Sequence, residues 1–154
     1  MGTKRVGLAR TQALIQNLKR ELQMNGSTIR GGVRQVVSLT GAGATKTLTA
    51  SDSGALVVLA GSNPSTVTLP AAQAGAEFEI FAASAYNHVI NGGNSKIQGA
   101  IYDNSNATTL ARTAVTNRSS ITLANGAIGD CLTLISDGTN WYVKGWVNDT
   151  PTLG

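Results

Sequence analysis

The feature that most constrains this chain is a succession of short segments after Gly32 in which apolar and polar residues alternate. They are rich in Val, Ile, Thr and aromatic residues, and turn-forming residues separate nearly every pair. An alternation of period two is typical of half-buried strands. Eleven segments show it: VRQVVSLT, TKTLT, ALVVLA, STVTLP, AEFEIFA, YNHVIN, SKIQGAI, TTLARTAV, SSITLA, CLTLIS and WYVKGWV.

No helical pattern interrupts these segments, so the sequence predicts a mainly β body, an antiparallel sandwich or barrel of eight to eleven short strands. Asn91-Gly92, Asn125-Gly126 and Asp137-Gly138 are hairpin signals, because Asn, Asp and Gly tolerate the positive φ angles of tight turns. The clearest expected hairpin joins CLTLIS to WYVKGWV. No convincing repeat of about 20 to 50 residues is visible, and a solenoid is therefore not expected.

The first 32 residues follow a different period. Apolar residues recur at the spacing of one helix face, and Asn25-Gly26 is a favourable C-terminal cap, so an amphipathic helix is expected from about Gly7 to Met24. Its length would be roughly 27 Å. We therefore expect two regions: a helical arm with its linker at residues 1–32, and the β body at residues 33–154. The apolar residues of the arm are Leu8, Leu14, Ile15, Leu18 and Leu22.

Charge divides the chain at nearly the same place. Residues 1–34 contain seven basic residues and one acidic residue, whereas the remainder contains five basic and seven acidic ones. The net charge of +4 is thus the sum of a strongly basic N-terminal region and a weakly acidic body. An isolated helix of this length is marginal in water, so the apolar stripe of the arm needs a partner, which is its own body, a sister subunit or another protein. The expected contact residues of the arm are this stripe and the basic residues Lys4, Arg5, Arg10, Lys19 and Arg20.

The chain is poor in reactive groups. It contains one Cys and one His, so disulfides within the chain, Cys/His zinc sites and His-based triads lack their components. We expect no enzyme activity, cofactor or metal. The sequence GAGATKT at residues 41–47 lacks the glycine spacing of a phosphate-binding loop and is interpreted as a turn. Cys131 is expected in the core, and His88 either faces outward or lies in a polar interface.

Two aromatic residues and two carboxylates are candidates for contacts. The positions of Trp141 and Trp146 differ by an odd number, so the two side chains face opposite sides of a strand. One of them is expected to anchor the core and the other to be exposed. Glu77 and Glu79 share one face, which we interpret as a solvent or subunit-contact face. An exposed Trp can also stack on a sugar.

Neither a signal peptide nor a membrane span is expected, because charges and glutamines interrupt the leader and the longest apolar run is the six residues ALVVLA. The clustered Lys and Arg residues of the arm resemble those of a nucleic-acid-binding segment. They are interleaved with an apolar stripe, however, and the body has no matching positive surface by composition. An acidic protein surface is the expected partner instead of nucleic acid.

Four phrases of the body, LTASDSGALVVL, TVTLPAAQAGAEFEIF, HVINGG with IQGAI, and GDCLTLISDGTNWYVKGW, resemble β-domains of tailed-phage structural proteins. The resemblance is to capsid decoration (cement) proteins and some fibre modules, and it covers roughly residues 47–147. The leader KRVGLARTQALIQNLKREL is similar to the N-terminal segments of small structural proteins of marine phages. No catalytic residue is implied.

The resemblance implies a virion protein made in the bacterial cytoplasm that binds the outer capsid surface. Its expected partners are the major capsid protein and sister copies, since decoration proteins commonly form trimers with N-terminal segments on the shell. Weak contacts repeated over many copies would add by multivalency. The alternative is a head or tail fibre module that recognises glycans on the host surface.

Overall fold

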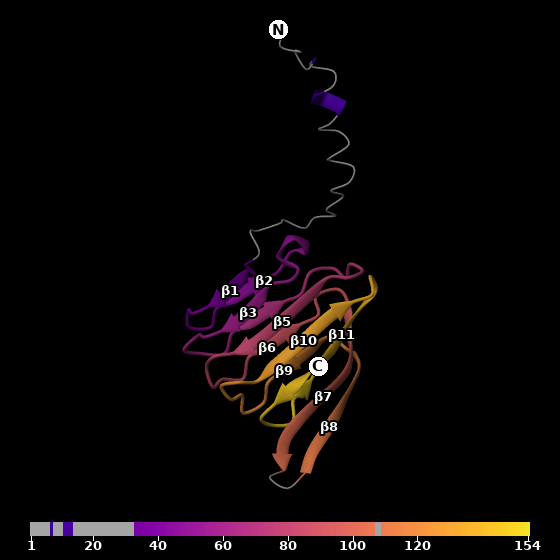
Figure 1. Ribbon diagram of the computed structural model, residues 1–154. Coiled ribbons are helices and arrows are strands. Elements are labelled where there is room, and N and C mark those ends of the chain that lie inside the picture. The colour runs from indigo at the N-terminus through magenta and orange to yellow at the C-terminus, as the bar shows by residue number, and fades with distance from the viewer. Residues whose placement is uncertain (1–6, 8–10, 14–32, 107–108) are drawn as a thin grey trace.

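Two β-sheets form the body of the protein (Figure 1). The structure is a computed structural model that describes residue 7, residues 11–13, 33–106 and 109–154. The seven-stranded sheet has the order β1 (Val36–Leu39), β3 (Leu56–Leu59), β5 (Glu77–Ala82), β10 (Cys131–Ser136), β11 (Asn140–Val147), β7 (Lys96–Asn106) and β8 (Thr109–Arg118). The five-stranded sheet has the order β12 (Thr152–Leu153), β9 (Ser120–Thr122), β6 (Val89–Asn91), β4 (Thr66–Thr68) and β2 (Thr45–Thr47). The prediction of a mainly β body is confirmed, and each of the eleven expected segments overlaps one of the strands β1 to β11, although β7, β8 and β11 extend beyond theirs.

The first six strands form successive coils, an arrangement that differs from the expected hairpins. The chain passes from one sheet to the other at each step, so β1, β3 and β5 pair in parallel, as do β2, β4 and β6. Val36 pairs with Leu56 and Leu56 with Glu79, and successive coils are therefore 20 and 23 residues long. The prediction of purely antiparallel pairing, and the rejection of a repeat, were wrong for this half. The physical reason is that each strand is followed by a turn into the opposite sheet instead of a hairpin.

The second half contains the antiparallel pairs. The expected hairpin of β10 and β11 is confirmed, and Asp137 Oδ1 accepts hydrogen bonds from the backbone N–H groups of Thr139 and Asn140, both at 2.8 Å. A second hairpin joins β7 and β8, and β7 also pairs in parallel with β11. The hairpin predictions at Asn91-Gly92 and Asn125-Gly126 were wrong, because these turns lead from the five-stranded sheet to the seven-stranded one.

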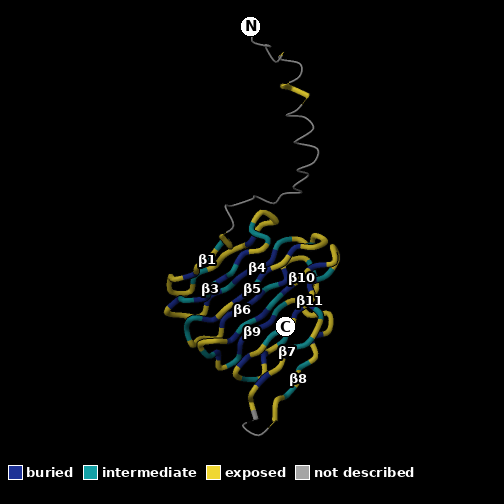
Figure 2. Tube along the Cα trace, viewed as in Figure 1, coloured by how far each residue is buried: buried dark blue, intermediate teal, exposed yellow. Residues whose placement is uncertain are grey.

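One core lies between the two sheets (Figure 2). Alternate residues of the strands point into it, as the burial of β3, β5 and β10 shows. Trp141 is its largest fully buried side chain. Its ring centroid lies 5.5 Å from that of Phe78, and its indole N–H donates to the carbonyl of Pro70 at 3.3 Å. The expectation that one tryptophan anchors the core is met by Trp141.

His88 is buried and connects two coils. Its Nδ1 accepts a hydrogen bond from the backbone N–H of Ser65 at 3.0 Å, so this nitrogen carries no proton. Its Nε2 then carries the proton and donates to the carbonyl of Ser84 at 3.1 Å. Burial lowers the pKa of His88 below its ordinary value, against the smaller opposing effects of Ser84 and Asp130. The imidazole is therefore a neutral cross-link inside the body, not an outward-facing group.

This geometry predicts a pH-dependent stability. Because the pKa of His88 is lower in the folded than in the unfolded protein, where it is about 6.5, the unfolded chain binds more protons between the two values. The stabilisation is complete above the unfolded pKa and is lost as the pH falls through the folded one. Urea unfolding at about pH 7.5 and about pH 5.5 should show this loss. We expect His88→Asn to be less stable at the higher pH and to lose less on acidification; equal losses in both proteins would contradict the assignment.

Asp103 is the second buried polar centre. It lies on β7, and its carboxylate accepts hydrogen bonds from the hydroxyl groups of Ser105, Thr113 (3.0 Å) and Thr150 (3.3 Å). The bond from Ser105 is the main reason that the pKa of Asp103 is lowered. This cluster ties the β7–β8 hairpin to the segment before β12.

The predicted helix over Gly7–Met24 falls almost entirely outside the described residues. Within it, Thr11–Ala13 are helical, and the backbone N–H of Thr11 donates to the carbonyl of Gly7 at 3.3 Å. The remainder of the arm, and the division at residue 32, stay predictions. The chain enters the body at Val33 and Arg34, beside β1.

Candidate interaction surface

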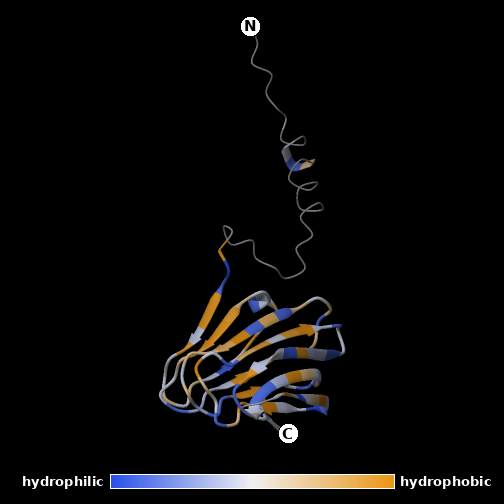
Figure 3. Ribbon diagram, turned by 60° about the horizontal axis from the view of Figure 1, so that its bottom comes forward, coloured by the Kyte–Doolittle hydropathy of each residue, from blue (hydrophilic) through white to orange (hydrophobic). Residues whose placement is uncertain are grey.

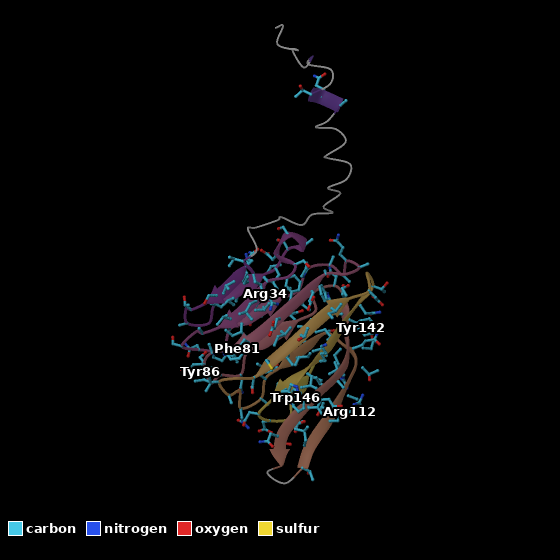
Figure 4. All side chains as sticks on the ribbon, in the orientation of Figure 1. Arg34, Phe81, Tyr86, Arg112, Tyr142 and Trp146 are labelled. Carbon is cyan, nitrogen blue, oxygen red and sulfur yellow. The ribbon has the colours of Figure 1, made fainter. Side chains whose placement is uncertain are left out.

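The outer face of the seven-stranded sheet carries a row of large side chains across its middle. Strand pairing places Val58, Phe81, Cys131, Trp146, Tyr102 and Arg112 side by side on six neighbouring strands. We call these six residues the aromatic row. Directly opposed residues on neighbouring strands lie about 5 Å apart, so the row forms one continuous surface. Figure 4 labels Phe81, Trp146 and Arg112, which mark its course from β5 to β8.

Four of the six residues of the row are exposed, and Val58 and Cys131 are half-buried. Trp146 is 56% exposed, and its ring stacks on that of Tyr102 with a centroid separation of 5.2 Å. A further row on the same face adds Ile135 and Tyr142, which oppose each other on β10 and β11. Of the ten large apolar side chains that are exposed among the described residues, six lie on this face: Val36, Phe81, Tyr102, Ile135, Tyr142 and Trp146. Exposed apolar side chains gathered on one face are typical of interaction sites.

Polar and apolar residues alternate along the strands (Figure 3), and the charges of the outer face are arranged by strand. Glu77 and Glu79 project from β5, whereas Lys144 projects from β11 and Arg112 from β8. Glu79 pairs with Thr133, and Thr133 pairs with Lys144. This acidic and this basic residue therefore lie in one row across the sheet, next to the aromatic row. Both carboxylates thus lie on the β5 side of the face. Glu77 and Glu79 share a face, as predicted.

Arg34 attaches the beginning of the body to this face. Its guanidinium forms an ion pair with Glu79 and donates to the carbonyls of Gly54 (2.7 Å) and Ala55 (3.3 Å). Arg34 is the last of the seven basic residues of residues 1–34. The chain therefore enters the body on the β5 side of the outer face.

The β10–β11 turn fixes one exposed aromatic side chain of the outer face, that of Tyr142. The hydroxyl of Tyr142 donates to Asp137 Oδ2 at 3.0 Å. Backbone N–H groups of Asn140 and Thr139 lower the pKa of Asp137, and the hydrogen bond to Asp137 raises the pKa of Tyr142. The exposed phenol ring is thereby fixed in orientation, which reduces the entropy cost of using it in a contact.

Of the two tryptophans predicted as possible exposed contacts, Trp146 lies on the surface. The prediction was wrong for Trp141, because its side chain is fully buried. The expectation that Cys131 packs in the core was wrong: it is half-buried and lies on the outer face, between Phe81 and Trp146. Residues 41–44 form the turn between β1 and β2, as interpreted. The ten contact residues predicted in the arm lie outside the described residues.

Sequence reasoning missed Phe81, Tyr102, Ile135 and Tyr142. Alternation within each segment was a usable signal, since Phe81 follows Glu77 and Glu79 at period two, and Tyr142 precedes Trp146 at the same parity. What the sequence does not contain is the order of the strands. That order brings residues 81, 102 and 146 into one row.

In residues 33–106 and 109–154, with the few described residues of the arm, no three His, Cys, Asp or Glu side chains are grouped as metal ligands would be. No described helix has the length and apolar character to cross a membrane. The arrangement on the outer face is suited to binding: flat aromatic rings provide contact area at low entropy cost, and charges around them set orientation.

The chain was also compared with known proteins. No family model, curated protein or solved structure matches it.

Proposed function

We propose that this protein is a structural component of a tailed-phage virion that decorates the outer surface of the capsid and stabilises it. Its partners in this proposal are the major capsid protein and sister copies, in an assembly expected to be a trimer. The observation that carries the proposal is the exposed aromatic row on a body whose other large apolar residues are mostly buried. Such a surface favours a role in binding another macromolecule over a catalytic role.

The basic arm supports the same function. Residues 1–34 have a net charge of +6, one charge of which is that of Arg34, already paired with Glu79, while the remaining residues have a net charge of −2. A cationic segment on a weakly acidic body favours a docking orientation in which the arm meets an acidic surface and the body does not. Decoration repeats this contact many times on one shell, so each contact can be weak.

One observation favours a second candidate, a fibre module that binds glycans. The stacked rings of Trp146 and Tyr102 form an exposed platform beside Arg112 and Lys144. Such a platform provides an apolar face for a sugar ring and charged donors for its hydroxyl or acidic groups. The two candidates differ in copy number, because a decoration protein covers the lattice and a fibre module is present in a few copies.

Deletion of residues 1–26 tests the role of the arm. We expect the truncated protein to lose most of its occupancy on expanded capsids, because the charges and apolar stripe proposed to contact the shell are gone. Occupancy is measured by sedimenting capsids with the protein and quantifying the bound fraction on gels. Full-length Arg10→Gln/Arg20→Gln is a milder variant, which is expected to bind more weakly and with less dependence on salt.

Circular dichroism of the truncated protein must show the same β signal as the full chain. With that control met, undiminished occupancy would contradict the proposed role of the arm. Binding of the truncated body to host-surface glycans, together with no capsid binding by the full chain, would favour the fibre module.

A further inference from the structure

The turn at Asn125-Gly126 combines the sequence of a spontaneous protein modification with a geometry that permits it. We propose that Asn125 is a site of deamidation in the folded protein, and that its conversion to a carboxylate loosens the closing segment of the body. In this reaction the backbone nitrogen of the next residue bonds to Cγ of the Asn side chain, and the side-chain amide leaves as ammonia with the proton of that nitrogen. Water then opens the succinimide ring to aspartate or isoaspartate. A following glycine favours the attack, because it has no side chain to hinder it.

The chain contains three Asn-Gly pairs, and two of them lie within the described residues, Asn91-Gly92 and Asn125-Gly126. The third, Asn25-Gly26, lies outside them. Because the two described pairs have the same sequence, a difference between their reaction rates in the folded protein comes from the structure. They therefore serve as each other's controls.

Asn91 is held in a geometry that opposes ring closure. It is the last residue of β6, a central strand that pairs with β4 on one side and with β9 on the other. The backbone N–H of Gly92, which would have to attack, donates to the carbonyl of Ser119 at 2.7 Å. Oδ1 of the Asn91 side chain accepts a hydrogen bond from the N–H of Gly93 at 2.8 Å. Ring closure at Asn91 therefore requires the sheet to open locally.

Asn125 lies instead in an exposed turn between β9 and β10. Its φ is +45°, a left-handed turn conformation. No described residue accepts a hydrogen bond from the backbone N–H of Gly126, the attacking group. The side-chain Nδ2 of Asn125 donates to Asp149 Oδ2 at 2.6 Å, an exposed hydrogen bond whose net contribution to stability is small. The peptide group can thus rotate toward the side chain without breaking a strand pair.

The product fits this turn less well than asparagine does. A carboxylate at position 125 has no N–H to donate to Asp149, so repulsion between like charges replaces the hydrogen bond. Isoaspartate also inserts a carbon atom into the main chain beside Gly126, where an added Cβ would lie 2.2 Å from the carbonyl oxygen of Tyr86. Both products weaken a tie between the turn and the segment that leads to β12.

Asp130 is a second tie between the same two segments. Its carboxylate accepts hydrogen bonds from the backbone N–H groups of Ala127 at 3.0 Å and Asn148 at 2.8 Å. Because this tie does not involve the side chain of Asn125, we expect deamidation to loosen the closing segment without unfolding the body.

Peptide mapping by mass spectrometry tests the site. Full-length protein is kept folded at mildly alkaline pH, where a backbone amide loses its proton more readily, and the converted fraction at each Asn-Gly pair is followed with time. We expect Asn125 to convert at least about tenfold faster than Asn91, which reacts only when its strand opens. In urea the two rates should become similar. A smaller ratio in the folded protein, or a ratio that urea leaves unchanged, would overturn the inference.

Asn125→Asp tests the consequence of the modification. We expect its thermal unfolding midpoint to lie about 2 °C or more below that of the unchanged protein, because a carboxylate then faces Asp149. Asn125→Asp/Asp149→Asn is the matched control, since it restores a donor opposite an acceptor and should recover most of the difference. Equal midpoints for the unchanged protein and Asn125→Asp, or no recovery in the double variant, would overturn the loosening. Neither assay involves a capsid, so the proposed function is judged separately.

Discussion

Replacing Trp141 with alanine is expected to lower the free energy of unfolding by about 3 to 5 kcal/mol, the usual cost of truncating a large buried aromatic side chain. Trp141 is completely buried, it contacts the ring of Phe78, and its indole N–H has a hydrogen bond to the carbonyl of Pro70. Alanine would leave a cavity between the two sheets. It would also leave that carbonyl without its donor.

Trp146→Ala is the matched control, because it changes the same residue type on the same strand. Its side chain is 56% exposed, so the expected loss is at most about 1 kcal/mol. Urea unfolding followed by circular dichroism measures both values. Similar losses for the two variants would show that Trp141 is not the centre of the core.

Gly99→Ala is expected to cost about 2 to 5 kcal/mol, since it combines backbone strain with overpacking. Gly99 has a φ of +131°, and a Cβ added there would lie 2.1 Å from the carbonyl oxygen of Val143. This residue lies on β7 at an irregularity in the pairing with β8, opposite Val143 on β11. The substitution therefore pushes apart the two strands that carry Tyr102 and Trp146.

Gly129→Ala separates the two contributions. Gly129 also has a positive φ, +104°, but a Cβ there would meet nothing within 4 Å. Strain alone should cost about 1 kcal/mol. Thermal or urea unfolding of the two variants gives the comparison, and a Gly99→Ala protein as stable as Gly129→Ala would contradict the close approach of β7 to β11.

The strands were predictable because their signal is local. Each of the eleven segments has its own alternation and its own flanking turn residues, and the β10–β11 hairpin has Asp137-Gly138 at its turn. The coils were not predicted, since the choice between a hairpin and a crossing to the other sheet depends on packing between distant residues. A faint repeat was present: Leu39 and Leu59, like Leu48 and Leu69, occupy equivalent buried positions in the first two coils.

The candidate site was predictable in part for the same reason. The parity of Trp141 and Trp146 is a local property, and it showed that the two face opposite sides. The position of Cys131 could not be read in this way, because CLTLIS is apolar on both faces and only strand pairing shows which face is covered. The row itself depends on β5 pairing with β10, and β11 with β7, over long separations in sequence.

The proposal that this protein decorates a capsid is tested most directly by saturation binding of the full-length chain to expanded capsids of a phage whose genome encodes it. The number of bound copies and their positions are read from a reconstruction of the decorated shell. We expect many copies, repeated with the symmetry of the capsid lattice and centred on its local three-fold axes. An undecorated shell at saturation, or density confined to a fibre or a single vertex, would contradict the claim.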